Sequence, residues 1–140
     1  MLPKTICLIL AVFAFAVCAV RADESDKKNA AIAAATSWLK LVDEGKYSES
    51  WMEAAAYFKS AVTQQQWDQS LQAVRRPLGS RLSRSVQNAT YTKALPGAPD
   101  GEYVVIQFTT SFANKKTAIE TVTPLLEKDG TWKVSGYYIK

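Results

Sequence analysis

GEYVVIQFTTSFANKKTAIETVTPLLEKDGTWKVSGYYIK, residues 101–140, carries the strongest structural pattern in the chain. Apolar side chains recur at every second position in its first segment: Val104, Ile106, Phe108 and Phe112. This period predicts a half-buried strand over Glu102–Phe112 with one apolar face. The next segment, Thr117–Leu126, is rich in β-branched residues, which pack well on a pleated surface. We expect it to form the second strand.

A third strand follows a short turn. Asp129-Gly130 tolerates the positive φ angles of a type I′ turn, so Thr131–Ile139 is predicted to fold back antiparallel. Strict alternation would place three residues of this strand on one face: Trp132, Val134 and Tyr138. Pro124 cannot donate to a strand ladder, and we expect it at an edge or a bulge where the sheet curls.

The first helix is predicted upstream of these strands, over Asn29–Asp43, where alanines and an apolar stripe favour an amphipathic helix. Asp23–Lys28 is expected to be a mobile, charged lead-in. Ser25 or Asp26 is placed to cap the helix that follows it.

Two shorter helices are predicted next. One starts at Ser48 or Ser50 and runs to about Phe58. The other begins after Thr63, which has capping-box spacing with Gln66, and it ends before Pro77.

A further strand is predicted over Arg81–Thr92, followed by a Pro- and Gly-rich loop at Leu95–Gly101. The order of elements is therefore three helices and then about four strands. This order predicts an α+β fold in which the N-terminal helices pack on one face of a curled antiparallel β-sheet.

The first 22 residues have the pattern of a secretory signal peptide. An uncharged apolar run at Ile6–Val20 is too short for a typical membrane span, and small residues precede a cut after Ala22. We therefore expect a single domain over 23–140 that is periplasmic or secreted, with no membrane span. Lipidation at Cys18 is the alternative, although the residues before it fit a lipoprotein signal poorly.

Composition excludes several classes of chemistry. The chain has no histidine, and its two cysteines, Cys7 and Cys18, lie in the predicted signal peptide. A mature chain would thus lack Ser-His-Asp and Cys-His catalytic sets and zinc or haem ligation by histidine or thiolate, and we expect no cofactor and no metal. Loss of Lys4 and Arg21 changes 17 basic and 13 acidic residues to 15 and 13, so the formal charge falls from +4 to +2. Such a small surplus does not indicate nucleic-acid binding.

Acid–base chemistry would have to use carboxylates and tyrosines. Glu120 lies in the second predicted strand and could face a dry interior as a general base, although we favour a solvent-facing position. Asp43 is expected at the end of the first helix, where a carboxylate opposes the helix dipole. Tyr103 or Tyr137 would supply the proton.

Two further groups of side chains allow either a site or a plain structural role. Four arginines within ten residues could bind an anion, although charge clusters usually lie on solvated faces: Arg75, Arg76, Arg81 and Arg84. Seven aromatic residues could line a pocket for an apolar ligand, or they could fill the core: Trp38, Trp51, Phe58, Trp67, Phe108, Trp132 and Tyr138.

An ordered set of short motifs covers nearly the whole region after residue 23. The set consists of Trp38, Asp43-x-Gly45-x-Tyr47, Ser50-Trp51, Trp67, Arg76-Pro77-Leu78-Gly79, Pro99-Asp100-Gly101-Glu102-Tyr103, Glu120-Thr121, Asp129-Gly130-x-Trp132 and Gly136-Tyr137-Tyr138. It resembles a bacterial family called domain of unknown function 4019. The resemblance implies an exported protein, and it carries over no activity and no catalytic residue. The element order also resembles the nuclear-transport-factor-2-like or cystatin-like superfamily, which implies helices on a curved sheet that often enclose a pocket.

These patterns favour an exported, non-enzymatic binding module. Its ligand would be a small apolar molecule or a partner protein at the concave face of the sheet. The expected ligand-binding residues are Trp38, Trp51, Arg81, Tyr103, Phe108, Glu120 and Tyr138. The alternatives are a small lyase, isomerase or hydrolase with a carboxylate base and a tyrosine acid, and a structural module that forms a homodimer through its sheets.

Overall fold

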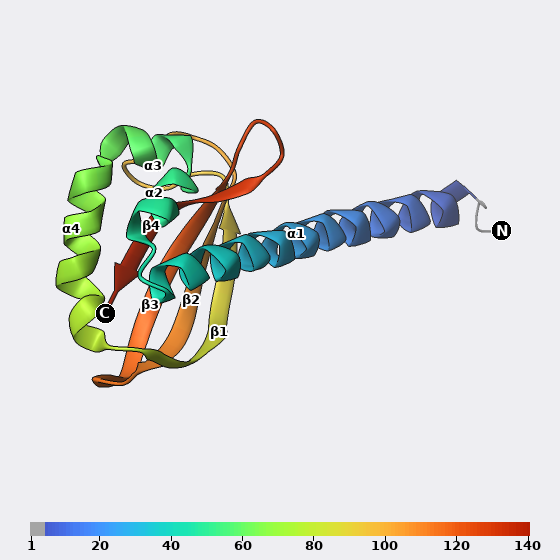
Figure 1. The fold of residues 1–140 in the computed structure, drawn as a ribbon. Coiled ribbons are helices and arrows are strands. Elements are labelled where there is room, and N and C mark those ends of the chain that lie inside the picture. Colours follow the sequence, from blue (N-terminus) through green and yellow to red (C-terminus); the bar gives the residue numbers. More distant parts are fainter. Residues whose placement is uncertain (1–4) are drawn as a thin grey trace.

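A computed structural model describes residues 5–140 of the chain, and side chains from residue 23 onward (Figure 1). The helical elements are α1 (Thr5–Asp43), α2 (Tyr47–Met52), α3 (Ala56–Ala61), α4 (Gln64–Val74) and the 3₁₀ turn η1 (Arg76–Leu78). The strands are β1 (Arg81–Thr92), β2 (Tyr103–Phe112), β3 (Lys115–Leu126) and β4 (Trp132–Ile139). The predicted α+β class is confirmed, because the N-terminal helices pack on a four-stranded antiparallel sheet.

The sheet is a meander in the order β1-β2-β3-β4, with each strand antiparallel to the next. All four strands lie within two residues of their predicted ends. The predicted curl is wrong, since the sheet is not strongly curled. Pro124 lies in an inner strand at a register shift between Val122 and Pro124, so a local bulge accommodates the proline while the strands stay paired.

The same bulge changes which residues of β4 face the helices. Val122 pairs with Tyr137, whereas Pro124 pairs with Val134, so β4 carries one more residue than β3 over this stretch. Beyond the bulge, Tyr137 packs against the core, whereas Tyr138 is 61% exposed. The prediction that Tyr138 shares a face with Val134 is therefore wrong.

The hairpin between β3 and β4 is confirmed, but its turn is not type I′. Gly130 has a φ of 86°, whereas no described residue other than glycine has a positive φ. The backbone N–H of Glu127 donates to the Thr131 carbonyl at 2.8 Å, which closes a three-residue loop. The Asp129 carboxylate accepts hydrogen bonds from the N–H and hydroxyl of Thr131, at 3.0 and 2.6 Å, and this holds Asp129 at negative φ.

Helix α1 crosses one face of the sheet, and its N-terminal part projects away from it (Figure 1). Residues 23–28 lie inside this helix, so the prediction of a mobile lead-in with a cap at Ser25 or Asp26 is wrong. Lys27 contacts Asp23 one turn earlier at 3.1 Å and Glu102 at 2.6 Å, and these ion pairs support the helix in this stretch. The signal peptide predicted for residues 1–22 begins outside the described residues, and its cleavage stays a prediction. None of the helices in the described part of the chain combines the length and the apolar character needed to cross a membrane.

The predicted second helix is divided into α2 and α3. Ala55 lies between them in an extended conformation, with φ −60° and ψ 148°. Its backbone N–H donates to the carbonyl of Val134 in β4 at 2.8 Å. This contact with the sheet replaces an intrahelical hydrogen bond, which explains the break.

The core lies between the helices and the sheet and is rich in aromatic rings. Trp67 is central: its ring centroid lies 5.0 Å from Phe58 and 6.0 Å from Trp38. The indole N–H groups of Trp38 and Trp67 donate to the carbonyl and the hydroxyl of Ser50, at 2.8 and 2.9 Å. These three rings and Phe108 are buried and fill the core, whereas Trp51 and Trp132 are half-buried and Tyr138 is exposed.

Helix α4 begins with the predicted capping box. Gln66 N–H donates to the Thr63 hydroxyl at 3.2 Å, and Thr63 N–H donates to the Gln66 side chain at 3.0 Å.

We expect Thr63→Ala to lower the free energy of unfolding by about 1 kcal/mol, because a helix N–H loses its partner. Urea denaturation measures this change. Thr63→Ser keeps the hydroxyl acceptor and should be nearly as stable as wild type. A serine variant as unstable as the alanine variant would contradict the capping role.

Candidate functional site

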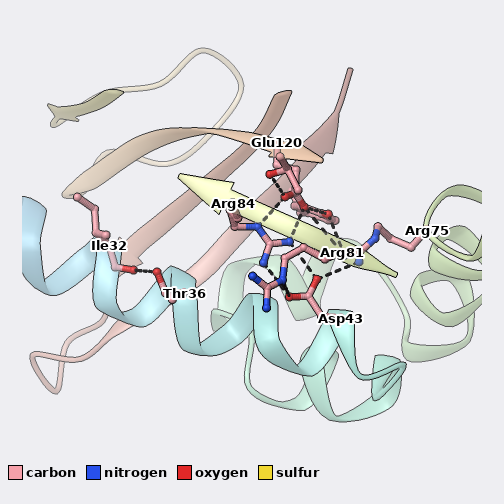
Figure 2. Close-up of polar contacts among 9 residues, drawn as sticks. Ile32, Thr36, Asp43, Arg75, Arg81, Arg84 and Glu120 are labelled. Atoms are coloured by element: carbon pink, nitrogen blue, oxygen red, sulfur yellow. Dashed lines mark hydrogen bonds and ion pairs between the residues drawn. The ribbon is translucent and has the colours of Figure 1, made fainter. Parts of the chain in front are cut away.

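Five charged side chains meet where the end of α1 approaches β1 and β3, and Figure 2 shows them pointing toward one another. We call this group the ion-pair cluster. It consists of Asp43, Arg75, Arg81, Arg84 and Glu120. Asp43 is the last residue of α1, Arg75 follows α4, Arg81 and Arg84 begin β1, and Glu120 belongs to β3.

Arg84 is at the centre of the ion-pair cluster and bridges its two carboxylates. It donates to Asp43 through both terminal nitrogens: Nη1 to Oδ2 at 2.7 Å and Nη2 to Oδ1 at 2.9 Å. It also donates to Glu120, through Nε to Oε1 at 2.7 Å and Nη2 to Oε2 at 3.2 Å. Burial alone would lower the pKa of Arg84, but the hydrogen bonds and charges of the two carboxylates outweigh it and raise that pKa, so this guanidinium stays charged inside the cluster.

Glu120 has no exposed surface. The favoured prediction of a solvent-facing carboxylate is therefore wrong. Besides Arg84, it accepts hydrogen bonds from the Thr110 hydroxyl at 2.5 Å and from the Tyr137 hydroxyl, and Arg75 Nη1 lies 4.0 Å away. These partners compensate the charge of a carboxylate that would otherwise be costly to bury.

Asp43 contacts all three arginines of the ion-pair cluster. Arg75 Nη2 lies 2.9 Å from Oδ1, and Arg81 Nε lies 3.1 Å from Oδ2. Burial alone would raise the pKa of Asp43, but the hydrogen bonds and charge of Arg84, and then those of Arg75, outweigh it and hold that pKa below its ordinary value. The carboxylate opposes the dipole of α1, as predicted, and the arginines offset that cost.

The charges of the ion-pair cluster do not balance. Three guanidinium groups face two carboxylates, so the cluster has a formal charge of +1. The side chains of Arg75 and Arg84 are 3% and 7% exposed, whereas that of Arg81 is 42% exposed. The surplus positive charge is therefore presented to solvent by Arg81.

A cleft of about 490 Å³ opens beside Arg81, between α1 and β1, and we call it the α1–β1 cleft. Its walls include Lys40, Asp43, Glu44, Arg81, Arg84 and Val86, and Phe108 of β2 contributes to its lining. Two of the predicted ligand-binding residues, Arg81 and Phe108, thus share one cleft. This volume lies within the range of sites for small ligands.

The other predicted ligand-binding residues lie elsewhere. Trp38 lines a second cleft of about 400 Å³ near α2 and β4, and Tyr138 lines a third of about 200 Å³ beside α4. Trp51 is half-buried, and its indole donates to the carbonyl of Val62 at 2.7 Å. Tyr103 is buried, and its hydroxyl donates to the carbonyl of Pro99 at 2.6 Å. The seven residues therefore do not form one site.

The acid–base alternative has one supporting contact, between Tyr137 and Glu120. Burial, and then the charge of Glu120, raise the pKa of Tyr137, so its hydroxyl stays protonated and acts as a hydrogen-bond donor. Because Glu120 is fully buried and its oxygens already accept from Arg84 and Thr110, a substrate could reach it only by displacing the ion-pair cluster. This geometry is typical of a structural carboxylate.

Sequence reasoning did not identify Lys40 and Val86 as possible ligand contacts. Lys40 lies in the last turn of α1, where a basic residue is ordinary. Val86 is an apolar residue of β1 on the face toward the helices, paired in register with Phe108. In the sequence, only the alternation of inward- and outward-facing residues along β1 could have indicated its position, and the register shift between Val86 and Asn88 interrupts that alternation. Among the described residues, no group of three or more acidic, cysteine or histidine side chains could hold a metal ion.

Comparison with known proteins finds one family. The family model described as "Protein of unknown function (DUF4019)" matches residues 34–137, which include all five members of the ion-pair cluster. No curated protein and no solved structure matches the chain. The resemblance to the nuclear-transport-factor-2-like superfamily therefore stays a prediction.

Proposed function

The chain belongs to the DUF4019 family, and we propose that it is an exported, non-enzymatic module that binds a small, negatively charged ligand in the α1–β1 cleft. Export is supported by the signal-peptide pattern of residues 1–22. Binding in the cleft is supported by its size and by the ion-pair cluster at its end. The proposal moves the expected site away from the buried aromatic rings of the core to the side of α1.

The position of Arg81 is the observation that carries the proposal. Each of the three guanidinium nitrogens of Arg84 donates to Asp43 or Glu120. Arg81 instead approaches Asp43 with Nε 3.1 Å from Oδ2, the oxygen that Arg84 also contacts, and its side chain is 42% exposed. Its two terminal nitrogens are therefore available to an incoming anion, and the planar guanidinium suits a carboxylate or a phosphate.

The rest of the ion-pair cluster holds Arg81 in place. Asp43 accepts hydrogen bonds from both Arg75 and Arg84, and these bonds restrict the carboxylate that orients Arg81. Lys40, one turn before Asp43 on α1, adds a second positive charge to the wall of the same cleft. A preorganised cation at the end of a cleft reduces the entropic cost of binding.

Arg81→Gln tests the proposal. We expect wild-type protein to bind acetate in the α1–β1 cleft and the variant to bind it about tenfold more weakly, because a hydrogen bond to a charged group is lost. NMR titration with potassium acetate measures both affinities from the amide signals of Lys40, Arg81 and Val86. Potassium chloride at equal ionic strength corrects for screening.

Arg76→Gln is the matched control, because Arg76 is an exposed arginine five residues away and does not line the α1–β1 cleft. It removes the same charge and should leave acetate binding unchanged. Equal weakening by both variants would show that acetate responds only to net charge. An absence of acetate-dependent shifts at the cleft would overturn the proposal.

A further inference from the structure

Val86 gives the α1–β1 cleft an apolar surface. It points toward the helices, like its register partner Phe108, yet it is 45% exposed whereas Phe108 is 2% exposed. The difference arises because the facing residues of α1 at this point, Thr36 and Ser37, are small and leave the cleft open above β1. An exposed valine on the inner face of a sheet offers contact area to an apolar group.

The apolar surface lies close to the charged end of the same cleft. Arg84 and Val86 are two residues apart on β1 and point to the same face, so their side chains leave the strand about 7 Å apart. Arg81 and Arg84 both contact the carboxylate of Asp43, so the guanidinium of Arg81 lies at the end of the cleft where Arg84 is. The cleft therefore has a cationic end and, a few ångströms along β1, an apolar wall.

From this arrangement we infer that the ligand is a small monocarboxylate with a short unbranched apolar chain. The carboxylate pairs with Arg81, and the chain lies along β1 against Val86. A single negative charge matches the formal surplus of +1 in the ion-pair cluster. This inference rests on the proposed function, because it assigns a tail to the anion that the cleft binds.

The dependence of affinity on chain length tests the inference. Acetate, butyrate, hexanoate and octanoate are titrated against wild-type protein by NMR. Full burial of one methylene contributes about 0.8 kcal/mol, which is about fourfold in affinity, so a partly exposed chain should gain about twofold to fourfold per methylene. We expect this gain from acetate to hexanoate. Hexan-1-ol, which has the chain without the charge, should bind far more weakly than hexanoate.

Variants of β1 distinguish the contribution of the ligand's apolar chain from that of its carboxylate. Val86→Ser should reduce the gain per methylene, so it should weaken hexanoate binding far more than acetate binding. Leu82→Ser is the matched control, because Leu82 is an exposed apolar residue of the same strand outside the cleft lining, and it should retain the wild-type gain. Arg81→Gln should weaken every acid by a similar factor.

Each outcome bears on a stated claim. Binding of acetate with no gain along the series, or a gain that Val86→Ser leaves intact, would overturn the apolar subsite and leave the anion site standing. Hexan-1-ol binding as tightly as hexanoate would overturn the assignment of a carboxylate. Failure of all four acids to shift the cleft signals would overturn both this inference and the proposed function.

Discussion

Replacement of Glu120 by glutamine is expected to lower the free energy of unfolding by about 3–5 kcal/mol, the cost of removing one partner from a buried ion pair. The amide has nearly the shape of the carboxylate, so the loss comes from charge. It raises the formal charge of the ion-pair cluster from +1 to +2 and leaves Arg84, which is 7% exposed, with Asp43 alone. The amide also offers one acceptor oxygen where the carboxylate accepts from Thr110 and Tyr137 on different oxygens.

Urea denaturation at pH 7 measures the loss, and two further variants make the result specific. Glu53→Gln removes an exposed carboxylate and should change stability by less than about 0.5 kcal/mol, as surface substitutions do. The double variant Arg84→Gln, Glu120→Gln restores the formal charge of +1, and its loss should be smaller than the sum of the two single losses. A Glu120→Gln protein within about 1 kcal/mol of wild type would show that the cluster tolerates an uncompensated guanidinium and would contradict this account.

The sheet could be predicted from sequence because its signals are local. The period-two pattern of β2 and the β-branched run of β3 each lie within one segment, and both segments are strands. The capping box of α4 also depends on residues only three positions apart. These features need no information about the rest of the chain.

Features that depend on distant partners could not be predicted. The break between α2 and α3 arises where Ala55 donates to Val134, a residue 79 positions away in sequence. The face of Tyr138 depends on a bulge that exists only when β4 pairs with β3. Strict alternation within one strand carries no information about either contact.

The candidate site likewise has local features that the sequence indicates and long-range contacts that it does not. The four arginines were visible as a local cluster, but their roles were not, because Arg84 takes its partners from α1 and β3. Arg76 remains exposed, whereas Arg75 is buried over the ring of Phe112, with the guanidinium carbon 4.7 Å from the ring centroid. Sequence adjacency alone could not distinguish these two neighbours. The position of Asp43, where a carboxylate opposes the helix dipole, is a second local signal that indicates the site.

Asp43→Asn should lower the free energy of unfolding by about 2–4 kcal/mol at neutral pH, somewhat less than Glu120→Gln because the Asp43 side chain is 13% exposed. The change leaves three guanidinium groups with one carboxylate. Relief of the unfavourable interaction with the dipole of α1 offsets part of the loss, by about 0.3–1 kcal/mol. The exposed neighbour Glu44 gives the matched control, and Glu44→Gln should change stability far less.

The loss caused by Asp43→Asn should itself depend on pH. The pKa of Asp43 is held below its ordinary value in the folded protein by Arg84 and Arg75, against the opposing effect of burial. A carboxylate with a lowered pKa contributes stability that is fully present above its unfolded pKa of about 3.9 and that disappears as the pH falls through the folded value. The difference in unfolding free energy between wild type and Asp43→Asn should therefore be constant above about pH 5 and shrink progressively below about pH 4. A difference of the same size at pH 7 and at the acid limit of folding would mean that the loss comes from shape or hydrogen bonding, and not from the charge that fixes Arg81 at the cleft.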